Sequence, residues 1–158
     1  MNVQVIKRDE NGQPVRAKSR IVVLGNLERR VWSKEDRYAP VISQVGVRIF
    51  ISGAVRKGRM TKQGDCKNAF CQPTMPEEEV VVVKPPKGCP LSKPGTYWKL
   101  RKTLYGLSRS PRHWFECFTK ALRELGLKAC PHEPCIYTGK VREDLPPMQV
   151  AIYVDDFL

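Results

Sequence analysis

The chain has 158 residues and carries 28 Lys and Arg against 16 Asp and Glu, a formal net charge of +12. This length is enough for one domain with a core, and the basic excess favours a polyanionic partner, with nucleic acid the first candidate. No apolar run is long enough to cross a membrane, and no secretory signal precedes the six cysteines, so we expect an intracellular, reduced protein rather than a secreted disulfide scaffold.

The first part of the chain predicts a polar segment, residues 1–14, followed by a strand. Asn11-Gly12 is a typical hairpin turn. The stretch from Val15 to Leu24 alternates as a strand does, which places Arg16, Lys18 and Arg20 on one face. The other basic residues are spread along the chain, a pattern that suits a folded groove tracking a phosphate backbone. A basic surface without a nucleic-acid partner is the simpler alternative.

A helix is predicted from Ser43 to Lys57. Ser43 is a good N-cap residue, and Gly58 follows the last turn. Val45, Ile49 and Val55 fall near one face, which we expect to be the apolar one, with Phe50 and Ile51 beside it.

Two short strands and a second helix follow. Val80–Val83 has the composition of a buried strand, and Tyr97–Arg101 reads as a second short strand. Ser110-Pro111 is a helix start, with a cap residue before proline at the first helical position, and Gly126 ends the helix. An apolar stripe at helical spacing within it predicts core packing: Trp114, Phe115, Phe118, Ala121, Leu122 and Leu125.

The last strands lead into paired carboxylates. Residues 135–138 and 149–154 are expected to pair as strands, and Asp155-Asp156 follows directly. Adjacent acids repel each other, and a divalent cation relieves that repulsion; hard oxygen ligands favour Mg²⁺ or Mn²⁺. A solvated turn pair is the alternative, because Asp is common in turns.

Asp65 is the best candidate for a third carboxylate. It follows a short strand-like stretch, residues 59–64. Two metal ions about 3.5–4 Å apart can support an in-line displacement at phosphorus, and such a site needs an acid that bridges both. Asp65 and Asp155, on neighbouring strands, could supply it.

The order of these motifs resembles the reverse transcriptase of copia-type long-terminal-repeat retrotransposons, from about residue 15 to the last residue. The motifs that carry the resemblance are Lys18–Val22, Tyr38–Val41, Gln63–Phe70, Leu104–Leu107, Ser110–Trp114, His132–Tyr137 and Tyr153–Asp156. The resemblance implies an α+β fold of fingers and palm, with an antiparallel palm sheet backed by helices. It implies RNA- and DNA-templated DNA synthesis from deoxynucleoside triphosphates with two Mg²⁺ (or Mn²⁺) ions, in a cytoplasmic particle or the nucleus.

The resemblance also implies roles for individual residues. Asp65, Asp155 and Asp156 would be catalytic and would bind metal, with the backbone carbonyl of Cys66 as a further ligand. Phe70 would be a gate against the ribose 2′-hydroxyl. Nucleotide contacts are expected from the fingers and from residues near the primer end: Lys18, Arg20, Arg109 and Tyr153.

This chain departs from the family pattern in three places. Leu24 and Arg109 stand where the family often has arginine and glutamine, which alters the expected nucleotide contacts. Nothing follows Leu158, so we expect residues 15–158 to form the fingers and a partial palm, truncated in the catalytic hairpin. The returning strand, primer grip, thumb and ribonuclease H domain would be missing.

Three functions stay open at this point. The chain could be the fingers and palm of a polymerase, which acts with the rest of a retrotransposon polyprotein on an RNA template and DNA primer. It could be an inactive remnant that at most binds nucleic acid. An RNA-binding module unrelated to polymerases is the third, and no RNA-recognition signature supports it.

Overall fold

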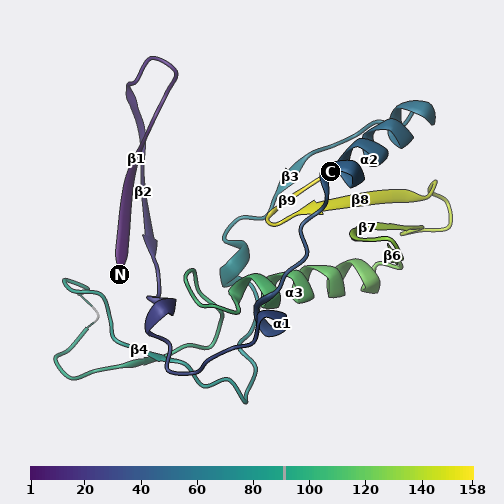
Figure 1. Cartoon of the computed structure of the whole chain (residues 1–158). Helices are drawn as coiled ribbons and strands as arrows, with labels where there is room; N and C mark the ends of the chain where they lie inside the picture. Colours follow the sequence, from purple (N-terminus) through teal and green to yellow (C-terminus); the bar gives the residue numbers. More distant parts are fainter. Residues whose placement is uncertain (91) are drawn as a thin grey trace. The chain divides into compact units, whose positions relative to one another are not determined.

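The computed structural model describes residues 1–90 and 92–158 (Figure 1). It divides into two compact units. Unit 1 comprises Met1–Arg37 and Phe70–Ser110, and unit 2 comprises Tyr38–Ala69 and Pro111–Leu158. Helices and antiparallel strands together agree with the expected α+β class. In the described part of the chain, no helix combines the length and the apolar character needed to cross a bilayer.

Unit 1 begins with a two-stranded antiparallel ribbon of β1 (Asn2–Arg8) and β2 (Pro14–Ile21). The predicted turn between them is confirmed: Gly12 has φ of 78°, and the Asp9 carboxylate accepts hydrogen bonds from two backbone N–H groups of the turn. The strand ends at Ile21 rather than Leu24, and residues 2–8 pair with it as part of the same ribbon.

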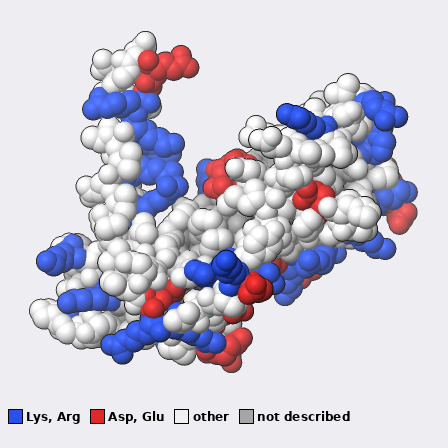
Figure 2. Space-filling model, viewed as in Figure 1, with Lys and Arg blue, Asp and Glu red and all other residues white. Residues whose placement is uncertain are grey.

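One face of this ribbon is basic. Residues opposite one another in an antiparallel pair share a face, and the register places Lys7 opposite Arg16, Val5 opposite Lys18 and Val3 opposite Arg20. The shared face predicted for Arg16, Lys18 and Arg20 is therefore confirmed, and Lys7 joins it. Figure 2 shows the blue side chains of Lys and Arg gathered along the ribbon, with red acidic side chains near its tip.

The rest of unit 1 has short elements joined by loops. They are the 3₁₀ turn Gly25–Leu27, α1 (Lys34–Arg37), β4 (Val82–Val83) and β5 (Trp98–Lys99). Both short strands are present, and β4 and β5 pair antiparallel. The prediction of a buried strand over 80–83 is wrong, because Val80 and Val82 are 60% and 56% exposed. The prediction was based only on the apolar composition of these residues. A sheet of two strands with two residues each is too small to bury the valine side chains.

Unit 2 contains a five-stranded antiparallel sheet in the order β3-β9-β8-β7-β6. Its strands are β3 (Gly64–Asp65), β6 (Lys128–Cys130), β7 (Glu133–Gly139), β8 (Met148–Tyr153) and β9 (Asp156–Phe157). The expected pairing of the strands around residues 135–138 and 149–154 is confirmed. The expectation that the returning strand is missing is wrong, because β9 turns back and pairs with both β8 and β3.

Two helices pack with this sheet: α2 (Gln44–Arg56) and α3 (Ser110–Glu124), which lies in unit 2 from Pro111 onward. The buried residues of helices, strands and connecting segments form one hydrophobic core: Ile42, Phe50, Leu122, Leu127, Cys135, Tyr137, Val150, Ala151 and Ile152. Both predicted helices are confirmed, including the cap: the Ser43 side chain accepts a hydrogen bond from Gly46 N–H at 2.9 Å.

The predicted apolar face of α2 is wrong. Val45, Ile49 and Val55 are exposed, and the helix buries the face that carries Gly46, Phe50 and Ala54 instead. Glycine suits position 46 on that face, because a Cβ there would lie 2.7 Å from a carboxylate oxygen of Glu133. In α3 the core prediction holds for Trp114 and Leu122, and Phe115 and Phe118 are partly buried against the core. It is wrong for Ala121 and Leu125, which are exposed.

Candidate active site

Asp155 lies in a tight turn that joins β8 to β9. Tyr153 and Asp156 are register partners across the turn, with Val154 and Asp155 between them. Val154 has φ of 57°, while Asp155 is not among the described residues with positive φ, the pattern of a type II′ hairpin turn. Ala151 and Leu158 close the hairpin by exchanging backbone hydrogen bonds of 3.0 and 2.9 Å.

β3 brings Asp65 beside this hairpin. Asp65 is the register partner of Asp156, and Gly64 is the partner of Phe157. Because opposite residues of an antiparallel pair share a face, the carboxylates of Asp65 and Asp156 stand on the same side of the sheet. Glycine at position 64 leaves room for the Phe157 ring, since a Cβ there would lie 2.2 Å from the end of that ring and would force it to shift.

Cys66 connects β3 to the turn. Its backbone N–H donates to the carbonyl oxygen of Asp155 at 2.8 Å. Burial first, and then the charges of the three nearby carboxylates, raise the pKa of the Cys66 thiol: Asp65, Asp155 and Asp156. The three acids predicted from the sequence therefore share one neighbourhood around Cys66. Metal ligation by the Cys66 carbonyl stays a prediction.

The donor set suits a hard divalent cation. Asp65 is exposed, and Asp155 and Asp156 are half-buried, so carboxylate oxygens, which Mg²⁺ and Mn²⁺ prefer, are accessible. Within the described residues, no group of three His, Cys, Asp or Glu side chains is close enough to hold a metal ion. The geometry supplies a pair of facing carboxylates with a third on the adjoining turn.

Trp114 on α3 holds the turn from the helix side. The sequence indicated only core packing for this residue, and it is indeed 6% exposed. Its indole Nε1–H also donates to the carbonyl oxygen of Val154 at 2.6 Å. A buried tryptophan N–H usually has a hydrogen-bond partner, so the sequence indicated that one would exist. It could not indicate which one, because Val154 is 40 residues away.

Unit 1 carries most of the residues predicted to contact the nucleotide. The guanidinium of Arg20 lies 5.0 Å from the centre of the Tyr105 ring. Phe70 meets the same ring edge-on, with ring centres 5.5 Å apart, and the Thr103 hydroxyl donates to the Phe70 carbonyl at 2.7 Å. The structure therefore joins the predicted triphosphate contact and the predicted gate through Tyr105, which sequence reasoning did not assign to the site.

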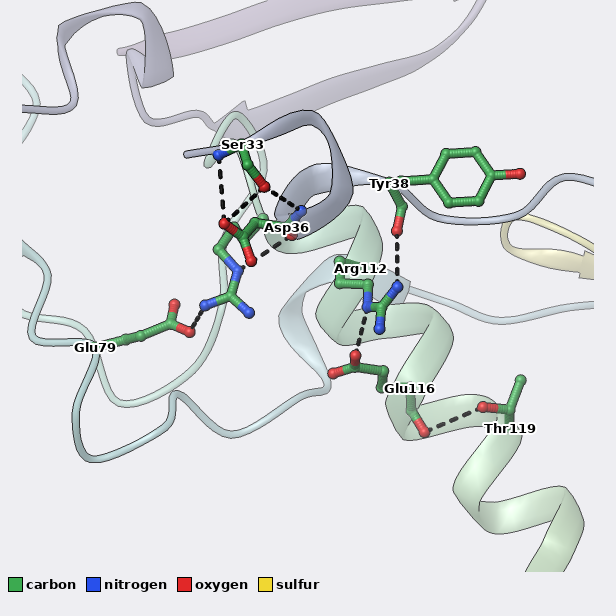
Figure 3. A network of polar contacts seen from close by, with 8 residues as sticks. Ser33, Asp36, Tyr38, Glu79, Arg112, Glu116 and Thr119 are labelled. Carbon is green, nitrogen blue, oxygen red and sulfur yellow. Dashed lines mark hydrogen bonds and ion pairs between the residues drawn. The ribbon is translucent and has the colours of Figure 1, made fainter. Parts of the chain in front are cut away.

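Arg109, also predicted to contact the nucleotide, is engaged within unit 1. It forms an ion pair with buried Glu79, and its guanidinium lies 4.5 Å from the centre of the Trp32 ring. Its Nε–H donates to the carbonyl of Asp36 at 3.3 Å. Figure 3 shows Ser33, Asp36 and Glu79 in this network, and the hydrogen bonds from Ser33 lower the pKa of the Asp36 carboxyl. A nucleotide contact by Arg109 stays a prediction, and a nucleotide would have to compete for the guanidinium with Glu79, Trp32 and Asp36.

The Arg112 side chain links two further parts of unit 2. It pairs with Glu116 one turn along α3 and donates to the Tyr38 carbonyl at 3.4 Å (Figure 3). This contact fastens the chain that leads toward α2 to the first turn of α3, the helix that carries Trp114.

A pocket of about 700 Å³ lies in unit 1, and its lining includes Trp32 and Glu79, the partners of Arg109. Apolar side chains including Leu24, Trp32, Val81 and Trp98 line it. None of the predicted site residues is among its lining residues, so its size alone does not mark the site.

Comparison with known families decides the identity. The model of the family described as "Reverse transcriptase (RNA-dependent DNA polymerase)" matches residues 2–158. This chain belongs to the reverse transcriptase family. The resemblance stated from the motifs is thereby confirmed, and the match extends over the β1 strand at the start of the chain.

This reverse transcriptase chain is similar to transposon polyproteins of plants. It is 29% identical over 154 residues to the "Retrovirus-related Pol polyprotein from transposon TNT 1-94" of Nicotiana tabacum, covering 97% of this chain and 11% of that protein. It is 29% and 28% identical, each over 152 residues, to the corresponding polyproteins from transposons RE1 and RE2 of Arabidopsis thaliana, covering 96% of this chain and 10% of each. The chain spans about a tenth of the length of these relatives. No solved structure matches it.

Proposed function

We propose that this chain carries the nucleotidyl-transfer site of a retrotransposon reverse transcriptase, with Asp65, Asp155 and Asp156 as its catalytic acids. One observation carries the proposal: Asp65 and Asp156 face each other on adjacent strands. Asp155 lies on the turn between β8 and β9, where its backbone carbonyl accepts a hydrogen bond from the Cys66 N–H. Acids from separate parts of the sequence converge at one end of the sheet, which a solvated Asp-Asp turn alone would not require.

The division of labour follows from the chemistry of the residues. Two divalent cations, when bound, would stabilise charge on the attacking 3′-oxygen and the departing pyrophosphate. Asp65 and Asp156 would hold them with Asp155, and Tyr153, 56% exposed beside the turn, would lie near the primer terminus. Neutral asparagine at any of these three acids would keep the size of the side chain and one oxygen, but it would remove the charge that attracts the cation.

The residues of unit 1 serve the nucleotide in this proposal. Lys18 and Arg20 neutralise the triphosphate, and Phe70 blocks the 2′-hydroxyl of a ribonucleotide by its bulk. The substrates are deoxynucleoside triphosphates, with an RNA or DNA template and a DNA primer. Because the chain spans about a tenth of its relatives, we propose that the complete enzyme also uses other segments of a polyprotein.

The test is primer extension on poly-rA with an oligo-dT primer, dTTP and Mg²⁺. The chain is compared with Asp155→Asn, and Asp144→Asn is the matched control. Asp144 is an exposed acid paired with Arg142 in the loop before β8, so it receives the same chemical change at the other end of that strand. Extension by the chain and by Asp144→Asn, with none by Asp155→Asn, is the expected result. Undiminished extension by Asp155→Asn refutes the assignment.

A second function, nucleic-acid binding without catalysis, is favoured by the basic face of the ribbon. Lys7, Arg16, Lys18 and Arg20 lie on that face. If all four contact phosphates of a single strand, log K falls with log salt with a contribution of about −3 to the slope, from about 0.7 for each contact. Absent extension by the unsubstituted chain, together with binding that follows this slope and ignores Asp65→Asn, would establish this second function in place of the first.

A further inference from the structure

The turn that carries Asp155 holds a residue in an unfavourable conformation. Val154 and Asn68 are the non-glycine residues with positive φ in the described chain, at 57° and 54°. Asparagine tolerates this region, whereas a β-branched valine is a genuine outlier there. Such a conformation costs about 1–3 kcal/mol and persists only where surrounding contacts hold it. The contacts that hold Val154 are therefore part of the design of the turn.

Both peptide groups that flank Asp155 are held from outside the hairpin. The carbonyl of Val154, in the peptide group before Asp155, accepts the indole N–H of Trp114 at 2.6 Å. The carbonyl of Asp155, in the peptide group after it, accepts the backbone N–H of Cys66 at 2.8 Å. The orientations of two flanking peptide planes determine φ and ψ of the residue between them. These two bonds thus fix the direction in which the Asp155 side chain leaves the backbone.

The indole of Trp114 cannot turn away from this bond easily. It is stacked on Phe118 one helical turn along, with ring centres 5.2 Å apart and planes 11° apart. Phe118 in turn packs against Phe157 of β9, with ring centres 5.9 Å apart. The donor is therefore held in place by the helix and by the return strand of the same hairpin, and it requires no ordering when the bond forms.

We propose that Trp114 is a positioning residue for Asp155, acting through its indole N–H on the Val154 carbonyl rather than through packing alone. The inference rests on the proposed function for its catalytic consequence, and its structural part stands on the turn geometry. Packing against Phe118 needs only an aromatic ring, whereas the hydrogen bond needs the N–H. A change that keeps the ring and removes the N–H separates the two roles.

Two variants of Trp114 make this separation. Trp114→Phe keeps an aromatic ring, and replacement of Trp114 by 3-benzothienylalanine keeps the bicyclic shape with sulfur in place of N–H. Trp98→Phe, in β5 of unit 1, is the control for loss of a tryptophan elsewhere. The chain has three tryptophans, so the indole N–H of Trp114 is readily assigned by comparing spectra of these variants.

The first measurement is amide hydrogen exchange at Cys66, whose N–H donates to the Asp155 carbonyl. We expect both Trp114 variants to raise its exchange rate about two- to tenfold, the size of one lost hydrogen bond, with no change in Trp98→Phe. The second measurement is kcat and KM for dTTP in primer extension. We expect kcat to fall about two- to tenfold in both variants, with KM unchanged, because the triphosphate contacts proposed for Lys18 and Arg20 belong to unit 1 and are not altered.

Unchanged Cys66 exchange in the benzothienylalanine variant overturns the proposal. Raised exchange with a raised KM and an unchanged kcat also overturns it, because that result describes a general loosening. If the unsubstituted chain extends no primer, the proposed function fails for this chain, and Cys66 exchange alone decides whether Trp114 positions the turn. The two failures are therefore distinguishable.

Discussion

Gly64→Ala tests the contact between β3 and β9 beside the acids. A Cβ at Gly64 would lie 2.2 Å from Cζ and 2.7 Å from both Cε atoms of the Phe157 ring. The ring also packs against Phe118, at 5.9 Å between centres. It therefore has to shift with its strand, and overpacking of this kind costs about 1–3 kcal/mol.

The assay is urea denaturation followed by tryptophan fluorescence, with amide exchange at Phe157 as the local measurement. For a chain of this length, about 1–3 kcal/mol corresponds to a fall in Tm of about 2–12 °C. Gly53→Ala is the matched control. It is the same change inside α2, three residues before the last residue of the helix. A Cβ there has nothing within 4 Å, and the change is expected to stabilise by about 0.5–1 kcal/mol.

A double-mutant cycle identifies the cause. In a Phe157→Leu background the smaller side chain leaves room for a Cβ at position 64, so Gly64→Ala is expected to cost less there by at least about 0.5 kcal/mol. Equal costs in the two backgrounds, or a Gly64→Ala chain as stable as the original, would refute the steric argument.

Three other changes follow from the structure. In a chain that extends primers, Phe70→Ala is expected to raise ribonucleotide incorporation relative to deoxyribonucleotide incorporation; equal discrimination removes Phe70 from the gate. Gly106→Ala is expected to lower the free energy of unfolding by more than about 1 kcal/mol, because φ is 89° and a Cβ would lie 2.0 Å from the Val23 carbonyl oxygen. Gly95→Ala, also at positive φ but with nothing within 4 Å, should cost less in the same urea titration. Burial raises the pKa of Cys135 from 9.0 to about 11. The contribution of this thiol to the free energy of unfolding is therefore present below pH 9 and is lost as pH rises toward 11, by about 2–3 kcal/mol. If the free energy of unfolding of a Cys135→Ala chain falls as steeply between pH 9 and 11, the assignment is contradicted.

The sequence predicted those elements whose signals are local. The Asn11-Gly12 turn, the Ser43 cap and the Ser110-Pro111 helix start each depend on residues a few positions apart, and each is confirmed. The sequence also predicted that Asp65 lies near the doubled carboxylate, but its strand partner is Asp156, and Asp155, expected on the neighbouring strand, lies in the turn. Their catalytic role stays a prediction.

The errors arose where the deciding partner is distant in sequence. Periodicity could not tell which side of α2 packs, because that side is set by contacts with Ile42 and with Glu133, a residue 87 positions beyond Gly46. A two-residue return strand is too short to leave a pattern of its own. The second role of Trp114 depends on the Val154 carbonyl, 40 residues along the chain.

The acids lie where the strands of the sheet are shortest. β3 and β9 have two residues each, whereas β7 and β8 have seven and six. With so few ladder bonds, this end opens at a lower free energy than the rest of the sheet. Cations bound as proposed require the strands to be paired, so by mass action their concentration determines how often this end is closed. Loading of the site and folding of the last turn then become a single equilibrium, in which Mg²⁺ acts as a folding ligand as well as a cofactor.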